Sequence, residues 1–130
     1  MTMNKNLFCD IQTKNILYKD VIEEVGYQLE KDNIIKSHND YFQEVLNREK
    51  CGDIEIFPEV ILPHIQSENI LKTKICLIKS EHGLIQWHKQ SVKLIILLNL
   101  KPNEDKENLL EIQSFMRNLA DEDYIESLIK

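Results

Sequence analysis

The chain has 130 residues, of which 42% are hydrophobic and 29% are charged, and its formal net charge is −6. This length and composition predict a single globular domain over residues 1–130 and exclude a disordered or low-complexity chain. The acidic balance and the lack of a basic stripe argue against nucleic-acid binding by this domain. The longest continuous apolar run, residues 94–98, is far too short to cross a bilayer, so we expect no direct membrane insertion.

The cysteines indicate a reducing compartment. They are odd in number and widely spaced, without a C-x-x-C pair: Cys9, Cys51 and Cys76. This usage is typical of a cytoplasmic protein. Cys76 lies in an apolar run and is interpreted as a packing residue. Cys51 is near the candidate site in the sequence, but no redox role is predicted for it.

The first half of the chain predicts a short strand and two helices. Residues 7–11 form an apolar segment that fits a strand. Residues 18–32 repeat apolar side chains at helical spacing, and so do residues 37–50. The second of these helices begins with Ser37-x-x-Asp40, which resembles a capping box with Asp in place of Glu.

After Gly52 the apolar period changes to that of strands. Short apolar runs occur at residues 54–56, 60–62, 75–78, 84–87 and 92–100. The run over 92–100 is continuous, which predicts a strand that is buried on both faces of a sheet. Trp87 is expected to pack in the core or on the sheet.

The last third returns to a helical pattern. One apolar face is predicted for residues 108–120, with these members: Leu109, Ile112, Phe115, Met116 and Leu119. Residues 104–107 are interpreted as a solvated turn before this helix. Asp121 is predicted to cap a last short helix. The order of elements predicts an α/β single domain with a mixed central sheet flanked by helices on both sides.

The segment Pro58-Glu-Val-Ile-Leu-Pro-His-Ile-Gln66 is the first candidate site, because it places His64 directly after Pro63. Proline has no N–H and cannot continue a central ladder, so we expect the strand to end there and a short helical turn to follow over 65–71. Free backbone N–H groups at such a point favour an anion. A neutral imidazole is a nucleophile toward phosphoryl groups. The alternative is that His64 is only a polar residue in a surface loop.

No other motif predicts a catalytic site, a cofactor or a metal ion. The chain lacks phosphate-binding glycine loops and zinc-protease or nucleophile-elbow motifs. His82 and His88 flank a predicted turn at Gly83 and would meet across a hairpin, but no close paired ligand spacing accompanies them. We therefore expect no cofactor and no metal site.

The spacing of two motifs resembles a known family. Arg48-Glu49 stands at a predicted helix end, and His64 follows Arg48 by sixteen residues in the frame Val-Ile-Leu-Pro-His. In this order of elements, which covers nearly the whole chain, the pattern resembles the fructose/mannitol-type enzyme IIA domain of the bacterial phosphotransferase system.

The resemblance implies roles for three residues. His64 matches the histidine that takes a phosphoryl group from the phosphohistidine of the carrier protein HPr, and Arg48 matches the arginine beside it. A guanidinium suits phosphate oxygens. Asn108 stands where the family has a second histidine, and an amide can donate a hydrogen bond to phosphate but cannot carry a proton. In transport enzymes of the family, the next acceptor is a cysteine of an enzyme IIB domain.

Four further positions depart from the family pattern: Ile54, Phe57, Ile61 and Ile65. These changes, with Asn108, favour a regulatory copy like the domain that ends many sugar-operon regulators, since a regulator needs only slow phosphorylation. The segments 87–98 and 116–121 also resemble those regulators. The alternatives are a phosphoryl carrier in sugar uptake, and a docking domain that is not phosphorylated. Expected partners are HPr and either an enzyme IIB domain or the rest of a regulator.

Overall fold

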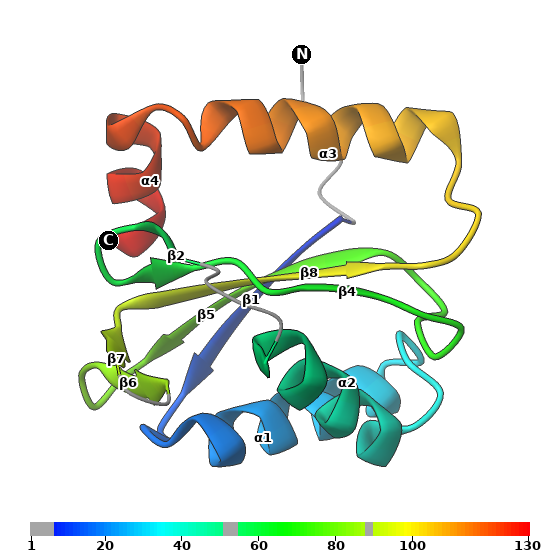
Figure 1. Cartoon of the computed structure of the whole chain (residues 1–130), viewed down its shortest axis with the longest axis horizontal. Coiled ribbons are helices and arrows are strands. Elements are labelled where there is room, and N and C mark those ends of the chain that lie inside the picture. Colours follow the sequence, from blue (N-terminus) through cyan, green and yellow to red (C-terminus); the bar gives the residue numbers. More distant parts are fainter. Residues whose placement is uncertain (1–6, 51–54, 88–89) are drawn as a thin grey trace.

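The computed structural model describes residues 7–50, 55–87 and 90–130 and arranges them in three layers (Figure 1). Helices α1 (Tyr18–Lys31) and α2 (His38–Lys50) cover one face of a central sheet. Helices α3 (Lys106–Asn118) and α4 (Glu122–Ile129) cover the other face. This arrangement confirms the predicted mixed sheet with helices on both sides.

The central sheet has six strands of mixed direction. Its members are β1 (Phe8–Thr13), β2 (Glu55–Phe57), β3 (Val60–Ile61), β4 (His64–Gln66), β5 (Lys74–Ser80) and β8 (Leu94–Leu100). The strand order is β1-β5-β8-β3-β2, and β4 also pairs with β8. Strand β8 is antiparallel to β5 and parallel to β3 and β4. A separate hairpin joins β6 (Ile85–Trp87) to β7 (Gln90–Val92).

Strand β8 lies between the two hydrophobic cores. Ile95 and Leu97 belong to the core beneath α1 and α2, whereas Leu94, Ile96 and Leu98 belong to the core beneath α3 and α4. Successive side chains of a strand point to opposite faces, so a continuous apolar run is what such a strand requires. The prediction of a strand buried on both faces is confirmed for residues 94–98.

The predicted strand over 92–100 is wrong in one respect, because the chain is interrupted at Lys93. The N–H of Lys93 donates a hydrogen bond to the carbonyl of Glu59 at 2.7 Å. Val92 before it ends the hairpin strand β7, and Leu94 after it begins β8. The hydrogen bond to Glu59, which is distant in the sequence, therefore divides the apolar run over 92–100 into two strands.

The predicted face of α3 is also only partly correct. Ile112, Phe115 and Leu119 are buried, whereas Leu109 and Met116 are 37% and 40% exposed. Positions 112, 115 and 119 form one narrow helical stripe, and this stripe alone rests on the sheet.

Glu104 is not the solvated residue predicted before α3. Its side chain is only 2% exposed and lies 3.9 Å from the ammonium of Lys101. Its Oε1 accepts a hydrogen bond from the N–H of Asp105 at 2.8 Å. The Glu104 carboxylate is therefore buried, which its residue type alone does not predict.

The predicted cap of α4 and the buried tryptophan are confirmed. The carboxylate of Asp121 accepts from the N–H of Asp123 and caps α4. Helix α3 begins two residues before the predicted segment over 108–120, because the carboxylate of Asp105 accepts from the N–H of Asn108 and caps it. Trp87 is 2% exposed. The predictions for Cys51, Ile54, His88 and the side chain of Glu49 fall outside the described residues. Within the described ranges, every helix is too short or too polar to span a bilayer.

Candidate functional site

His64 begins a strand instead of leaving one. Leu62 and Pro63 interrupt the edge of the sheet between β3 and β4, and both strands pair with β8. Proline cannot donate, but its carbonyl accepts a hydrogen bond from the N–H of Leu98 at 2.9 Å. The chain therefore stays on β8 across the break, and the predicted helical turn over 65–71 is wrong.

The alternation of β4 leaves His64 exposed. Ile65 is 4% exposed and packs in the core beneath α1 and α2. His64 and Gln66 point away from that core, because neighbouring side chains of a strand point to opposite faces. Among the described strands, β4 pairs with β8 alone.

The structure brings Arg48 and His64 together. Arg48 lies in the last turn of α2, and both side chains line one surface depression of about 280 Å³. The remaining lining residues are Glu44, Asn47, Ile65 and Gln66. This depression is a shallow surface feature in which a guanidinium and an imidazole can reach the same small anion.

The electrostatics of the depression favour a neutral imidazole. Partial desolvation lowers the pKa of His64 below its usual value, and the positive charge of Arg48 lowers this pKa further. A histidine whose pKa lies below the usual value of about 6.5 is mostly unprotonated at pH 7. One ring nitrogen then carries a free lone pair, as a nucleophile toward phosphorus requires.

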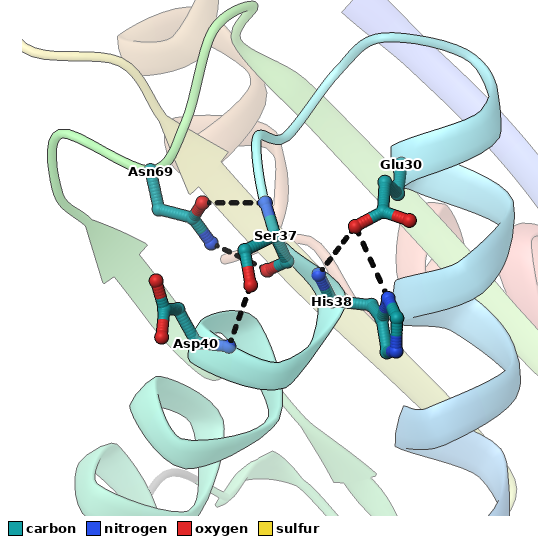
Figure 2. Close-up of polar contacts among 5 residues, drawn as sticks. All are labelled: Glu30, Ser37, His38, Asp40 and Asn69. Carbon is teal, nitrogen blue, oxygen red and sulfur yellow. Dashed lines mark hydrogen bonds and ion pairs between the residues drawn. The ribbon is translucent and has the colours of Figure 1, made fainter.

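A side-chain clamp holds the loop after β4 against the start of α2 (Figure 2). The Oδ1 of Asn69 accepts from the N–H of Ser37 at 2.9 Å, and its Nδ2 donates to the Ser37 carbonyl at 3.0 Å. The Ser37 hydroxyl accepts from the N–H of Asp40 at 3.2 Å. The predicted capping box is therefore half present, and Asn69 takes the part that the Asp40 carboxylate was expected to play. The clamp fixes β4 relative to the helix that carries Arg48.

A second contact ties α1 to the start of α2. The Oε1 of Glu30 accepts from the backbone N–H of His38 at 3.0 Å and lies 3.1 Å from its Nδ1 (Figure 2). These bonds, the backbone N–H first, lower the pKa of the Glu30 carboxyl. The His38 ring also stacks on Tyr27, with ring centres 4.1 Å apart. His38 is thus held as a structural contact at the turn between the helices.

Asn108 lies in a different depression from His64. It lines a hollow of about 430 Å³ beside Lys72, Thr73 and Lys101. That hollow also includes Lys74 of β5, and β5 and β4 pair with opposite edges of β8. The structure therefore does not place Asn108 with the pair formed by His64 and Arg48.

Three polar residues of the His64 depression were not predicted from the sequence. Gln66 stands two residues after His64, a spacing that places both side chains on the same side of a strand. The expectation of a helical turn over 65–71 hid this strand spacing. Glu44 precedes Arg48 by four residues, a spacing that places two side chains on one face of a helix, so the helical pattern is the signal that identifies it. Asn47 is adjacent to Arg48 in the sequence, and helical spacing gives no such signal for it.

Comparison with solved structures identifies the fold as that of enzyme IIA domains. One match is the nitrogen regulatory protein IIA-Ntr from Neisseria meningitidis, with a TM-score of 0.74 and 21% identity over 96% of this chain and 89% of that chain. A second is enzyme IIAMTL from Escherichia coli in a complex with phosphorylated enzyme IIBMTL, with a TM-score of 0.69 and 21% identity over 99% of this chain and 89% of that chain. A third is IIA mannitol from Escherichia coli, with a TM-score of 0.62 and 19% identity over the whole of both chains.

Comparison with protein families then gives the particular family. The family described as phosphoenolpyruvate-dependent sugar phosphotransferase system, EIIA 2, matches residues 3–130. The chain belongs to this family. The resemblance read from the Arg48–His64 spacing is confirmed at the level of the family.

Proposed function

We propose that this chain is a phosphoryl-accepting enzyme IIA domain that is phosphorylated on His64 by phosphorylated HPr and serves as a regulatory signal in sugar-operon control. The observation that carries the proposal is the exposed His64 beside Arg48 in one depression. The family membership supports the same chemistry. The reaction belongs in the cytoplasm, where we expect phosphorylated HPr to meet the domain.

In the proposed reaction, a neutral ring nitrogen of His64 attacks the phosphorus of the HPr phosphohistidine. A new nitrogen–phosphorus bond forms as the bond to the HPr ring breaks, so the phosphoryl group is conserved and no water is consumed. Arg48 binds the phosphoryl oxygens, where charge is spread during transfer. The lowered pKa of His64 keeps the nucleophile unprotonated at neutral pH.

The regulatory role is favoured by what surrounds the nucleophile. A fast carrier needs several groups around the phosphoryl oxygens, since phosphoryl transfer depends on positioning and electrostatics. Here Asn108 lines another depression, and the residue after His64 is the buried Ile65. His64 and Arg48 alone are enough for slow, reversible phosphorylation.

The alternative is a phosphoryl carrier in sugar uptake that passes the group to a cysteine of an enzyme IIB domain. One neighbouring structure is a complex between enzyme IIAMTL and phosphorylated enzyme IIBMTL, which supports this alternative. A second alternative is a docking domain without phosphorylation.

Intact-mass spectrometry tests the proposal. Incubation with phosphoenolpyruvate, enzyme I and HPr is expected to add one acid-labile phosphoryl group, and the His64→Ala variant is expected to add none. His82→Ala is the matched control, because His82 is exposed in the turn after β5 and is expected to leave labelling unchanged. The absence of any adduct on the folded wild-type protein would leave only the docking domain.

A second experiment separates regulation from transport. The phosphorylated chain is mixed with a mannitol-type and a fructose-type enzyme IIB domain, and loss of the phosphoryl group is followed by mass. A regulatory domain is expected to keep its phosphoryl group over minutes. Rapid, complete transfer to either IIB domain would establish the carrier function instead.

A further inference from the structure

Two free cysteines face each other on neighbouring strands. Cys9 of β1 and Cys76 of β5 are direct partners in the parallel register. Both side chains belong to the core beneath α1 and α2, so they point to the same face. Adjacent strands lie about 4.8 Å apart, which is within the range of Cα separations that a disulfide spans. The two thiols already share a hydrogen bond.

The two thiols have unequal environments. Cys76 is fully buried, and its pKa is raised by the hydrogen bond with Cys9 and by desolvation. Cys9 is partly exposed, and the hydrogen bond from Cys76 lowers its pKa to about 7. Partial burial of Cys9 opposes this effect, the charge of Lys74 adds to it, and the charges of Asp32 and Asp10 oppose it weakly. Cys9 is therefore the thiol that solvent can reach and that ionises first.

The pair also lies at one end of a buried chain of polar contacts. The Nδ2 of Asn99 donates to the sulfur of Cys76 at 3.6 Å, and the Oδ1 of Asn99 accepts from the hydroxyl of Tyr41. Tyr41 belongs to α2, and Asn99 is the register partner of Ile65, which follows His64. The dithiol is thus in continuous contact with the two elements that form the His64 depression.

From this geometry we propose that Cys9 and Cys76 are a modification site: a redox-sensitive dithiol in which Cys9 reacts with hydroperoxides and Cys76 then closes an intramolecular disulfide. This proposal is independent of phosphorylation at His64. The packing role predicted for Cys76 is confirmed, since its side chain is fully buried in the core beneath α1 and α2, and the proposal adds a chemical role to it. The two cysteines are 67 positions apart in the sequence (76 − 9 = 67), so the sequence alone does not show that they form a pair.

The reaction has two steps. The thiolate of Cys9 attacks one oxygen of hydrogen peroxide, the oxygen–oxygen bond breaks, and Cys9 becomes a sulfenic acid as hydroxide leaves and is protonated to water. The sulfur of Cys76 then attacks the sulfur of Cys9, the sulfur–oxygen bond breaks, and the released hydroxide takes the Cys76 proton to form water. In total, two thiols and one hydrogen peroxide give one disulfide and two waters.

The test uses the full chain in a Cys51→Ser background, which removes the third thiol. After brief exposure to hydrogen peroxide, the mass is expected to fall by about 2 Da, the mass of the two thiol hydrogens lost in forming one disulfide. Both remaining thiols are expected to become unreactive to iodoacetamide together, and dithiothreitol is expected to restore them. Peptide mapping is expected to show a bond between Cys9 and Cys76.

Two variants make the order of steps testable. In Cys76→Ser, a dimedone adduct is expected on Cys9, because the sulfenic acid has no thiol to react with. In Cys9→Ser, Cys76 is expected to stay reduced, because it is buried. Retention of both thiols in the Cys51→Ser protein, or a stable sulfenic acid on Cys9 with Cys76 present, would overturn the proposal.

A kinetic readout separates this role from simple packing. The rate of iodoacetamide alkylation of Cys9 is expected to rise with pH around 7 in the Cys51→Ser protein. In the double variant Cys51→Ser, Cys76→Ser, a hydroxyl replaces the thiol that shares the hydrogen bond with Cys9. The pH at which the alkylation rate of Cys9 is half its maximum is therefore expected to shift. Alkylation that begins only near the usual thiol pKa of about 8.5 in both proteins would contradict the assignment of Cys9 as the reactive thiol.

Discussion

The two faces of the central sheet are stabilised in different ways. In the core beneath α3 and α4, Ile96 and Leu98 of β8 pack against the apolar stripe of α3 that contains Ile112 and Phe115. In the core beneath α1 and α2, the hydroxyl of Tyr41 donates a hydrogen bond to Asn99 of the same strand, β8. On the first face, packing is joined by partly exposed bonds from the Lys79 ammonium of β5 to the carbonyls of Leu128 and Lys130 at the end of α4. The second face adds a fully buried hydrogen bond between a helix and the central strand.

The helix with the buried hydrogen bond is also the one that carries Arg48. Apolar packing tolerates small shifts of a helix, whereas buried hydrogen bonds lose their energy when their geometry changes. Asn99 and the clamp of Asn69 on Ser37 connect α2 to β8 and to the loop after β4. Arg48 and His64 thus belong to elements whose relative position is specified by bonds.

The largest loss of unfolding free energy is expected from a substitution in the core beneath α3 and α4. Phe115→Ala removes a ring that is 1% exposed and is expected to lower the free energy of unfolding by about 3–5 kcal/mol, measured by urea denaturation. Met116→Ala, at a position 40% exposed, is the matched control and is expected to change it by less than about 0.5 kcal/mol. Equal losses in both variants would contradict the narrow stripe described for α3.

A smaller loss of unfolding free energy is expected when the hydrogen bond between Tyr41 and Asn99 is removed on the opposite face of the sheet. Tyr41→Phe leaves the Oδ1 of Asn99 buried without its donor, and we expect a loss of about 1–3 kcal/mol in urea denaturation. The volume of the ring is unchanged, so the loss reports the hydrogen bond. An unchanged midpoint would show that this bond contributes nothing to stability.

Loss of the clamp between Asn69 and Ser37 is expected to lower the free energy of unfolding by a somewhat smaller amount. Asn69→Ala removes two hydrogen bonds to the backbone of Ser37, and we expect a loss of about 1–2 kcal/mol. Because the clamp positions β4 against α2, phosphorylation of His64 is also expected to slow. A stability loss without any change in the labelling rate would separate the clamp from the site.

The smallest expected effect is a change in the pKa of His64. Arg48→Gln removes a positive charge, so this pKa is expected to rise, although desolvation still holds it below about 6.5. Because the pKa of His64 is lower in the folded chain, the unfolded chain binds the proton more readily. His64 therefore has no effect on the free energy of unfolding at high pH, and it lowers this free energy as the pH falls below about 6.5. Proton NMR titration of the imidazole measures the shift, and an unchanged pKa would place Arg48 too far away to act.

Much of the fold could be predicted because it depends on local patterns. The helices around Val25 and Val45 follow from apolar spacing, and the start of α4 follows from the cap at Asp121. The strand at His64 could not be predicted, because Pro63 removes a donor but its carbonyl still pairs with β8. Which edge of β8 the chain follows is decided by tertiary contacts.

The candidate site was predictable in part for the same reason. The spacing of Arg48 and His64 identified two residues that line one depression. The placement of Asn108 depends on how the chain enters α3 after β8, and it lines a separate depression. The contact between Cys9 and Cys76 arises only when β1 pairs with β5, so cysteine spacing along the chain gives no sign of it.

The phosphoryl site is tested most directly by the initial rate at which phosphorylated HPr labels three proteins at one concentration: the wild type, Arg48→Gln and the matched control Arg117→Gln. Arg117 is exposed on α3 and lines neither depression described here. We predict a rate at least about tenfold lower for Arg48→Gln, since a charge-assisted contact to phosphate contributes about 1.5–3 kcal/mol, and an unchanged rate for Arg117→Gln. Equal rates in all three folded proteins would contradict the claim that Arg48 and His64 form one phosphoryl site.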